Sequence, residues 1–445
     1  MIVLFICSLS AWLITAVYSI VVKKHYIGLN LFVLLGIHFP MLLYFFGWSA
    51  YVDNSPTDEF FFIFFCLNLC MILFNLLIRD TCKFDLGTMP TKVSTGVVLL
   101  TDCIFATLFL VESYLGSRSF VPALVGIDIH AYSAPIIAFV TRNLFLIVIL
   151  NIVTFLVNRR KKYLVFAFAL IALPVVTRSM RITAIITLVQ VATFLALYFA
   201  AKRRGGERNI APSRLGTKVK RHKLAVVLVV VVAVAFTFGA AAMTNNRMSH
   251  YGKYDLDYST EIAYTGPEVL SDVVPVYYGY FPLSFNNLNL SLKYGTAEHN
   301  YVGLYSFTSV YFGLLQWDNV FGLDAFEPSA IGHRVYSTGS ATVATGFWDY
   351  WYDYGYFCFI PIVAMIAICA WITRRLQIKP SLFMYLQYCY FIPLVFFESF
   401  QNVFFGTETL YEVLFALILV RLAFGYSATG QDVVSRGSRL GELSI

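Results

Sequence analysis

Apolar stretches long enough to cross a lipid bilayer recur along almost the whole chain, and they constrain its fold more than any other feature. A transmembrane helix needs about 20 consecutive, mostly apolar residues. Only 13% of the 445 residues are charged, whereas soluble domains carry about 25%. We therefore predict an all-α polytopic membrane protein. Its 11 expected spans are residues 1–22, 30–50, 60–78, 96–114, 132–157, 163–176, 182–201, 224–243, 356–373, 382–401 and 407–425.

Lysine and arginine indicate which side of the membrane each connecting segment faces, because they gather in cytoplasmic loops. Of the 32 Lys and Arg residues, 23 fall in segments on one side of the predicted membrane and 7 on the other. Residues 202–223 alone hold nine of them and a single Glu. This asymmetry predicts an external N-terminus and a cytoplasmic C-terminus. The net charge of +7 is spread over short loops, so it does not indicate a nucleic-acid partner.

One long polar segment interrupts the apolar pattern. Between residues 244 and 355 there are 11 Asp and Glu against 4 Lys and Arg, together with 15 Tyr and 3 Trp. An acidic, aromatic-rich loop is expected on the external side, where its rings suit either sugars or the membrane interface. The predicted organisation is eight helices in residues 1–243, the large loop in 244–355, three helices in 356–425 and a cytoplasmic tail in 426–445.

Arginines outside the basic loops are candidates for binding an anion. Arg178 and Arg181 are three residues apart, so they share a face if a helix begins there. Two guanidinium groups at a helix N-terminus form an anion site, although contact with lipid headgroups is an alternative. Arg118 and Arg247 also lie on the external side, and four such arginines suit a lipid-linked phosphate or pyrophosphate. Arg142 falls near the middle of the predicted span 132–157, where a lone charge needs a partner or a wet cavity.

Histidines and carboxylates of the large loop are candidates for moving a proton. A histidine, or a carboxylate with a raised pKa, can take the proton of a hydroxyl group at neutral pH. We rank His333 first, because its neighbour Arg334 is a candidate for holding the acceptor or donor phosphate. Asp353 ranks second and His299 third. Asp349 and Asp353 are four residues apart in GFWDYWYDYG, so on a helix they share one face, with Trp348 alongside as a candidate glycan contact. The alternative is a solvated helix start, where acids favour the N-terminal end.

Three patterns resemble the bacterial Wzy-type polymerases of oligosaccharide repeat units, which include the O-antigen polymerases. The first is a short span that ends in a polar turn with arginine, here VVTRSMRITAIITL, and the second is a basic inner loop and one further span before a large periplasmic loop. The third is the end of that loop, STGSATVATGFWDYWYDYGYFCFIPI, and the inner segment GLYSFTSVYFGLL is also similar to the family's loop. By this resemblance Arg178 occupies the position of the family's arginine, and Asp353 that of its aspartate before the next span.

The resemblance implies a lipid-phosphate-dependent glycosyltransferase of the GT-C-like class in the bacterial inner membrane. Such an enzyme transfers a growing glycan from undecaprenyl pyrophosphate to a second undecaprenyl-linked unit in the periplasm, and so builds a surface polysaccharide such as that of lipopolysaccharide. Its implied partners are these lipid-linked glycans and membrane lipids, and a chain-length-regulating co-polymerase is a further candidate partner. No cofactor and no metal is implied. The alternatives are an O-antigen ligase, which passes the glycan to a lipid core, and a polysaccharide flippase or transporter.

Overall fold

The structure is a computed structural model, and its described part is helical. Within the described ranges the one element of β-type pairing is an isolated antiparallel bridge between Ser49 and Tyr264. The structure describes residues 1–22, 27–78, 86–122, 137, 140–178, 181–207, 258–268, 274–297, 299–308, 310–311, 334–337, 343 and 345–425.

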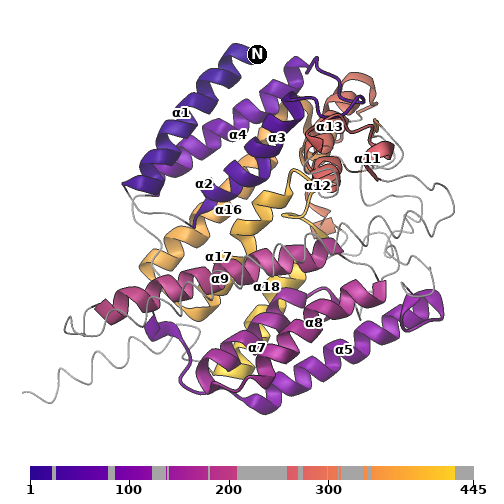
Figure 1. Cartoon of the computed structure of the whole chain (residues 1–445). Helices are drawn as coiled ribbons and strands as arrows, with labels where there is room; N and C mark the ends of the chain where they lie inside the picture. Colours follow the sequence, from indigo (N-terminus) through magenta and orange to yellow (C-terminus); the bar gives the residue numbers. More distant parts are fainter. Residues whose placement is uncertain are drawn as a thin grey trace, which may run out of the picture. The chain divides into compact units, whose positions relative to one another are not determined.

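Helices make up most of this part of the chain (Figure 1). The longer ones, in chain order, are α1 (Ile2–Val21), α3 (Phe39–Phe45), α4 (Asp58–Leu77), α5 (Thr95–Ser117), α7 (Leu144–Asn158), α8 (Lys162–Arg178), α9 (Arg181–Glu207), α12 (Val274–Tyr280), α13 (Pro282–Tyr294), α15 (Phe347–Tyr354), α16 (Phe359–Ile378), α17 (Leu382–Phe397) and α18 (Thr407–Phe424).

Five described helices are long and apolar enough to cross a membrane: α1, α4, α5, residues Ile182–Lys202 of α9, and α16. Shorter apolar helices cover Leu29–Phe45, Leu144–Asn158, Lys162–Val175 and Leu382–Phe397. This composition is that of an all-α, multi-pass membrane protein, as the sequence predicts. The count of 11 spans and their orientation stay predictions, and the predicted span 224–243 lies outside the described residues.

The predicted span 132–157 differs from the helix that the structure contains. Helix α7 begins only at Leu144, with Asn143 as its N-cap residue. Arg142 therefore lies in a turn between the helical residues 140–141 and α7, and not inside one continuous helix as the sequence predicted. The apolar residues on both sides of Arg142 concealed this helix start. At the other end of the chain, α17 stops at Phe397 and the following loop begins at Glu398.

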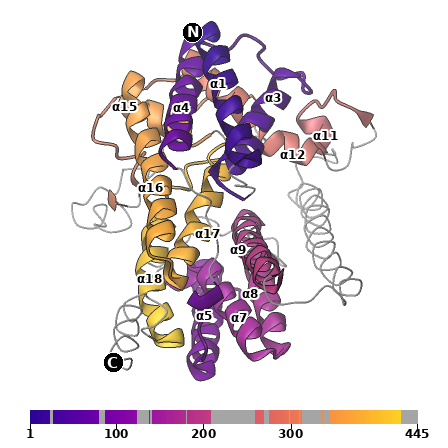
Figure 2. The ribbon, with the colours of Figure 1, turned by 90° about the vertical axis from the view of Figure 1, so that its left-hand side faces the viewer.

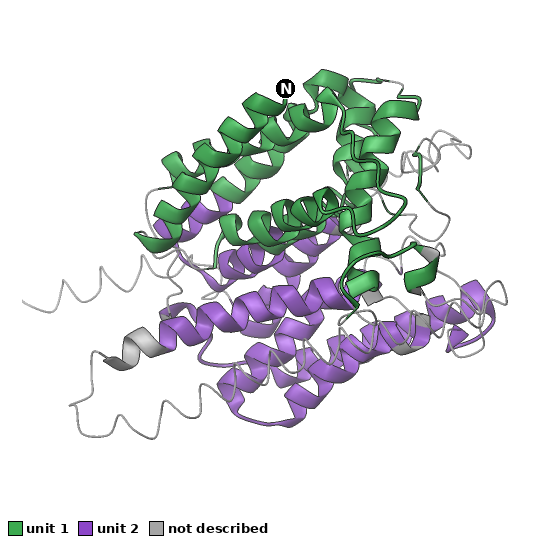
Figure 3. Ribbon diagram, turned by 45° about the horizontal axis from the view of Figure 1, so that its top comes forward, with its two compact units in different colours: residues 1–81, 206–370, 392–407 green, residues 82–205, 371–391, 408–445 purple. Residues whose placement is uncertain are grey.

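Two compact units divide the chain (Figure 3). The first contains residues 1–81, 206–370 and 392–407, and in it α1 runs alongside α4 (Figures 1 and 2). Polar side chains join these helices: the Asn30 amide donates to Asn75 (2.7 Å), and Trp12 Nε1 donates to Asn30 (3.1 Å). Such interhelical hydrogen bonds replace water for groups surrounded by apolar side chains.

Helix α13 organises the loops of the first unit. Its sequence, PLSFNNLNLSLKY, buries a run of asparagines. Asn286 accepts from the Asp53 N–H, Asn289 accepts from the Thr57 N–H, and Asn287 donates to the Val343 carbonyl. Buried amide side chains need such partners, and these bonds fix the segment before α4 and the segment before α15.

The second unit contains residues 82–205, 371–391 and 408–445. Within it α7 packs on α8, and α5 packs on both. The Ser94 N–H donates to the Ala423 carbonyl, which joins the start of α5 to the end of α18. Gln190 of α9 donates to the Tyr390 carbonyl of α17.

Candidate functional site

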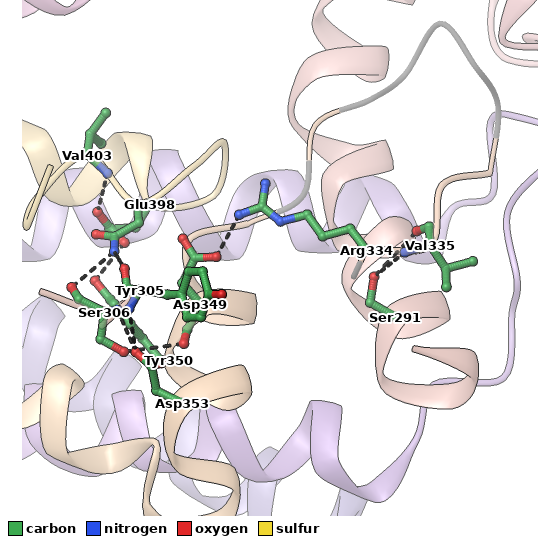
Figure 4. A network of polar contacts seen from close by, with 11 residues as sticks. Ser291, Tyr305, Ser306, Arg334, Val335, Asp349, Tyr350, Asp353, Glu398 and Val403 are labelled. Atoms are coloured by element: carbon green, nitrogen blue, oxygen red, sulfur yellow. Dashed lines mark hydrogen bonds and ion pairs between the residues drawn. The ribbon is translucent and has the colours of Figure 1, made fainter. Parts of the chain in front are cut away.

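Helix α15 is the centre of a buried polar cluster in the first unit (Figure 4). All eight of its residues, FWDYWYDY, are buried. It ends at Gly355, whose φ of +54° is a conformation that glycine adopts without strain. A Cβ at Gly355 would also lie 2.9 Å from the His299 Nε2 atom. A glycine is therefore required where α15 ends beside the imidazole of His299.

Asp349 forms a buried ion pair with Arg334. The Arg334 Nη2 atom donates to Asp349 Oδ1 at 2.8 Å, and both side chains are 5% exposed. Burial raises the pKa of Asp349, and the nearby guanidinium opposes this shift by favouring the carboxylate. The ion pair attaches residues 334–337 to α15. Asp349 is therefore not part of a solvated helix start, which was the alternative interpretation of the sequence.

Glu398 is a second buried carboxyl group of the cluster. Its Oε1 atom accepts from the N–H groups of Val403 (3.0 Å) and Phe404 (2.8 Å), and the Tyr350 hydroxyl donates to Oε2 (2.9 Å). Burial raises the pKa of Glu398 to about 8, although these hydrogen bonds favour its charged form. In the protonated state Oε2 carries the proton, and the bond to Tyr350 reverses its direction.

Asp353 is the third carboxyl group, and three donors occupy it. Its Oδ2 atom accepts from the N–H groups of Tyr305 (3.0 Å) and Ser306 (2.6 Å), and its Oδ1 atom accepts from the Asn300 amide (2.6 Å). The residue is fully buried, and this burial raises the pKa of Asp353 in spite of the donors from Ser306 and Asn300. Asp353 therefore fixes the loop 299–306 on α15, and no substrate hydroxyl has access to it in this arrangement.

His299 lies on the exposed edge of the same loop. Its Nδ1 atom is 3.1 Å from the Tyr352 carbonyl oxygen, which can only accept, so Nδ1 carries the hydrogen. The neutral ring then has its lone pair on Nε2. The imidazole packs edge-on against Trp351, with ring centroids 6.3 Å apart. His299 is exposed, and this combination of access and a defined tautomer suits a group that accepts a proton.

Three exposed aromatic residues lie near this histidine, in contact with it or with the rings that pack against it. Tyr301, Tyr356 and Phe357 are 58%, 61% and 54% exposed. The Tyr301 ring lies 6.0 Å from the imidazole of His299 and 6.4 Å from the ring of Phe357. Trp348 does not belong to this surface, because it is fully buried and packs against Tyr352 within α15. The prediction that Trp348 contacts a glycan is therefore wrong for this arrangement.

The structure brings together only some of the residues that the sequence singled out. His299, Arg334, Asp349 and Asp353 belong to one cluster. His333 and Arg247 lie outside the described residues. The remaining candidates belong to the second unit: Arg118 is exposed at the end of α5, Arg142 precedes α7, Arg178 ends α8 and Arg181 begins α9, the last two with side chains outside the described part.

Glu398 and Tyr350 are members of the cluster that sequence reasoning missed. Glu398 was placed inside a predicted span, and a charged residue within a span is itself a signal for a functional or structural site. The partners of the carboxyl groups could not be identified in this way, because Val403, Ser306 and Asn300 have no distinctive pattern around them. Among the described residues no group of three or more His, Cys, Asp or Glu side chains is arranged to hold a metal ion.

No protein-family model, curated protein or solved structure matches this chain. The arguments about its function therefore depend on its own residues.

Proposed function

We propose that this protein is a glycosyltransferase that polymerises undecaprenyl-pyrophosphate-linked oligosaccharide repeat units on the outer face of the bacterial inner membrane. The observation that carries the proposal is His299, an exposed residue whose Nδ1–H is directed at the Tyr352 carbonyl, which leaves the lone pair of the neutral ring on Nε2. The resemblance of residues 175–188 and 337–362 to the Wzy-type polymerases supplies the substrate class. The apolar helices supply a membrane setting in which a lipid-linked substrate is held.

In the proposed reaction, an acceptor sugar hydroxyl attacks the anomeric carbon of the donor glycan. The new C–O bond forms as the bond from that carbon to the pyrophosphate oxygen breaks, and the bonding electrons leave with undecaprenyl pyrophosphate. The hydroxyl proton passes to Nε2 of His299, which becomes an imidazolium whose Nδ1–H stays on the Tyr352 carbonyl. A single displacement of this kind inverts the anomeric carbon.

The exposed rings of Tyr301, Tyr356 and Phe357 are the proposed contact for the sugars of the acceptor. Sugar rings offer apolar C–H faces to aromatic side chains and hydroxyl groups to polar ones. Asp353 is assigned a positioning role, because it holds the loop that carries His299. Arg178 and Arg181 keep their predicted role as anion-binding residues, and substituting them is a separate test of that role.

Polymerisation by the purified full chain, with lipid-linked repeat units as donor and acceptor, tests the proposal. Removing a general base typically lowers the rate by about 10²–10⁴-fold, so we expect His299→Ala to show a loss of this size with unchanged thermal stability. His333→Ala is the matched comparison, because the sequence ranked that histidine first. Tyr301→Phe retains an exposed ring next to His299 and should stay active.

The identity of the acceptor distinguishes polymerase from ligase. Product chains that grow on undecaprenyl-linked units support a polymerase, whereas transfer only to a lipid core would make the protein a ligase. A His299→Ala variant with the wild-type rate and pH profile would show that His299 is not the base. If neither acceptor gives a product with the wild-type protein, the proposed glycosyl transfer is wrong.

A further inference from the structure

An aspartate and an asparagine face each other between two apolar helices of the second unit. Asp102 is the eighth residue of α5, and Asn151 is the eighth of the 15 residues of α7. At 1.5 Å per residue, Asn151 is about 10 Å from either end of its helix. Asn151 is fully buried, and its neighbours in LFLIVILNIVTFLVN are almost all apolar. The proposed function does not use either residue.

The two side chains share one hydrogen bond and leave two oxygen atoms without partners. Asn151 Nδ2 donates to Asp102 Oδ1 (2.7 Å) and also to the Ile147 carbonyl (3.2 Å). Both amide hydrogens of Asn151 are therefore committed. Asp102 Oδ2 and Asn151 Oδ1 are buried and have no hydrogen-bond partner within the part of the chain that the structure describes.

No cation neutralises Asp102 among the described residues. Helix α7 carries no titratable side chain, and α8, which packs on α5 and α7, has Lys162 and Tyr163 only at its start and Arg178 at its end. On α5 itself the other titratable residues are Cys103, Glu112 and Tyr114. Helix α18 contains Arg421, and its residue Ala423 accepts a hydrogen bond from Ser94, the residue before α5. None of these groups forms an ion pair with Asp102.

One proton satisfies both oxygen atoms. An ionised carboxylate only accepts hydrogen bonds, whereas a protonated one also donates a single bond. In a closed acid–amide pair, one acid oxygen accepts from the amide N–H and the other donates its proton to the amide oxygen. The structure contains the first of these bonds, and the two atoms of the second are the two without partners.

We propose that Asp102 and Asn151 form a proton-binding site between α5 and α7, a closed acid–amide pair in which Asp102 is a neutral acid. An ionised Asp102 would place an unpaired charge between apolar helices, which is costly. Release of the proton would also leave two buried acceptors without a donor. The bound proton and the packing of α5 on α7 are therefore linked.

Infrared spectroscopy of the purified full chain tests the protonation state directly. The difference spectrum between the wild-type protein and Asp102→Asn at neutral pH should contain the C=O band of one carboxylic acid, which shifts in D2O. A carboxylate band in its place would overturn the proposal. Glu112 and Glu412 are also buried, but both are present in the two samples and cancel in the difference.

Thermal unfolding of a set of variants tests the pairing. Asp102→Asn replaces the O–H donor by an N–H donor, so it should unfold close to the wild-type temperature. Asp102→Leu and Asn151→Leu each leave one buried polar partner alone and should unfold at lower temperature. The double Leu variant should recover most of the loss, because replacing both partners by apolar groups is nearly neutral.

A metal cation, instead of a proton, is the alternative that two such oxygen atoms could coordinate. If wild-type protein unfolds at higher temperature in sodium or potassium chloride than in choline chloride, and Asp102→Asn removes this difference, the site binds a metal cation and not a proton. The proton site requires equal unfolding temperatures in the three salts. Single Leu variants that unfold like the wild type would also contradict the pairing.

Discussion

Replacing Arg334 by leucine should destabilise the first unit more than any other single charge removal in its polar cluster. The Arg334 Nη2 and Asp349 Oδ1 atoms are 2.8 Å apart, with both side chains 5% exposed. Removing one partner of a buried ion pair typically costs about 3–5 kcal/mol, because the other charge stays buried and unpaired. At about 2–4 °C per kcal/mol, the expected fall in unfolding temperature is roughly 6–20 °C.

The double variant Arg334→Leu, Asp349→Leu is the matched control. Replacing both partners by apolar residues is often neutral or stabilising, so its unfolding temperature should lie near that of the wild-type protein. Fluorescence of the purified protein in detergent reports the loss directly, because Trp348 and Trp351 flank Asp349 and are buried in the folded state. The reasoning is refuted if Arg334→Leu unfolds like the wild type, or if the double variant is the less stable one.

The pH dependence of this defect has a definite sign. Burial raises the pKa of Asp349 above its ordinary value of 3.8, and Arg334 opposes that rise. In Arg334→Leu the guanidinium that favours the carboxylate is gone, so the pKa of Asp349 rises further. A carboxyl group with a raised pKa in the folded state stabilises the fold at low pH and loses that contribution as pH rises through the raised value. The difference in unfolding temperature between Arg334→Leu and the wild-type protein should therefore become smaller as the pH falls toward 3.8.

Two further predictions concern Glu398 and Gly36 of the first unit, with Gly96 of α5 as a control for the second. Burial raises the pKa of Glu398 from 4.5 to about 8, so the protein should lose stability as the pH rises from 4.5 to about 8. Glu398→Gln should flatten this dependence when thermal unfolding is measured at several pH values. An unchanged slope would show that Glu398 does not titrate in this range. A Cβ at Gly36 would lie 2.4 Å from the Phe396 Cα atom, so Gly36→Ala should lower the unfolding temperature. A Cβ at Gly96 of α5 would have no neighbouring atom within 4 Å, so Gly96→Ala should leave the unfolding temperature equal, or raise it because alanine favours the helix. Equal effects of the two glycine substitutions would contradict the close approach at Gly36.

The sequence predicted the helices well because their signal is local. Runs of apolar residues near the length of a bilayer span identify α1, α4, α5 and α16 to within a few residues. The prediction was wrong at the start of α7, because IIAFVTRNLFLIV is apolar on both sides of Arg142 and contains no clear boundary.

The candidate site was predicted only in part, because its contacts are non-local. Asp349 and Asp353 do lie on one short helix, as their spacing indicated. Their burial could not be predicted from an acidic, tyrosine-rich segment, which looks like a solvated helix start. The buried carboxyl groups need hydrogen-bond donors, and these donors lie up to 53 residues away in the chain, such as the Asn300 amide that donates to Asp353. The pairing of Glu398 with Tyr350 was missed for the same reason, since the two residues are 48 positions apart in the chain.

The hydrogen bonds of the cluster distinguish the residues that hold the proposed site together from the proposed general base. A general base needs a lone pair within reach of the hydroxyl that it deprotonates. Donors from within the protein occupy the carboxyl groups of Asp353 and Glu398, and Arg334 occupies Asp349.

The same donors explain why His299, and not one of these carboxyl groups, is the proposed base. Asp353 fixes the loop through Asn300, Tyr305 and Ser306, and its own carbonyl accepts from the Tyr301 N–H (3.0 Å). This places His299 with its Nδ1–H on the carbonyl of Tyr352, one residue before Asp353. In the proposed function, Asp353, which the sequence ranked second as a base, therefore has a positioning role: its hydrogen bonds set the orientation of His299, which the sequence ranked third.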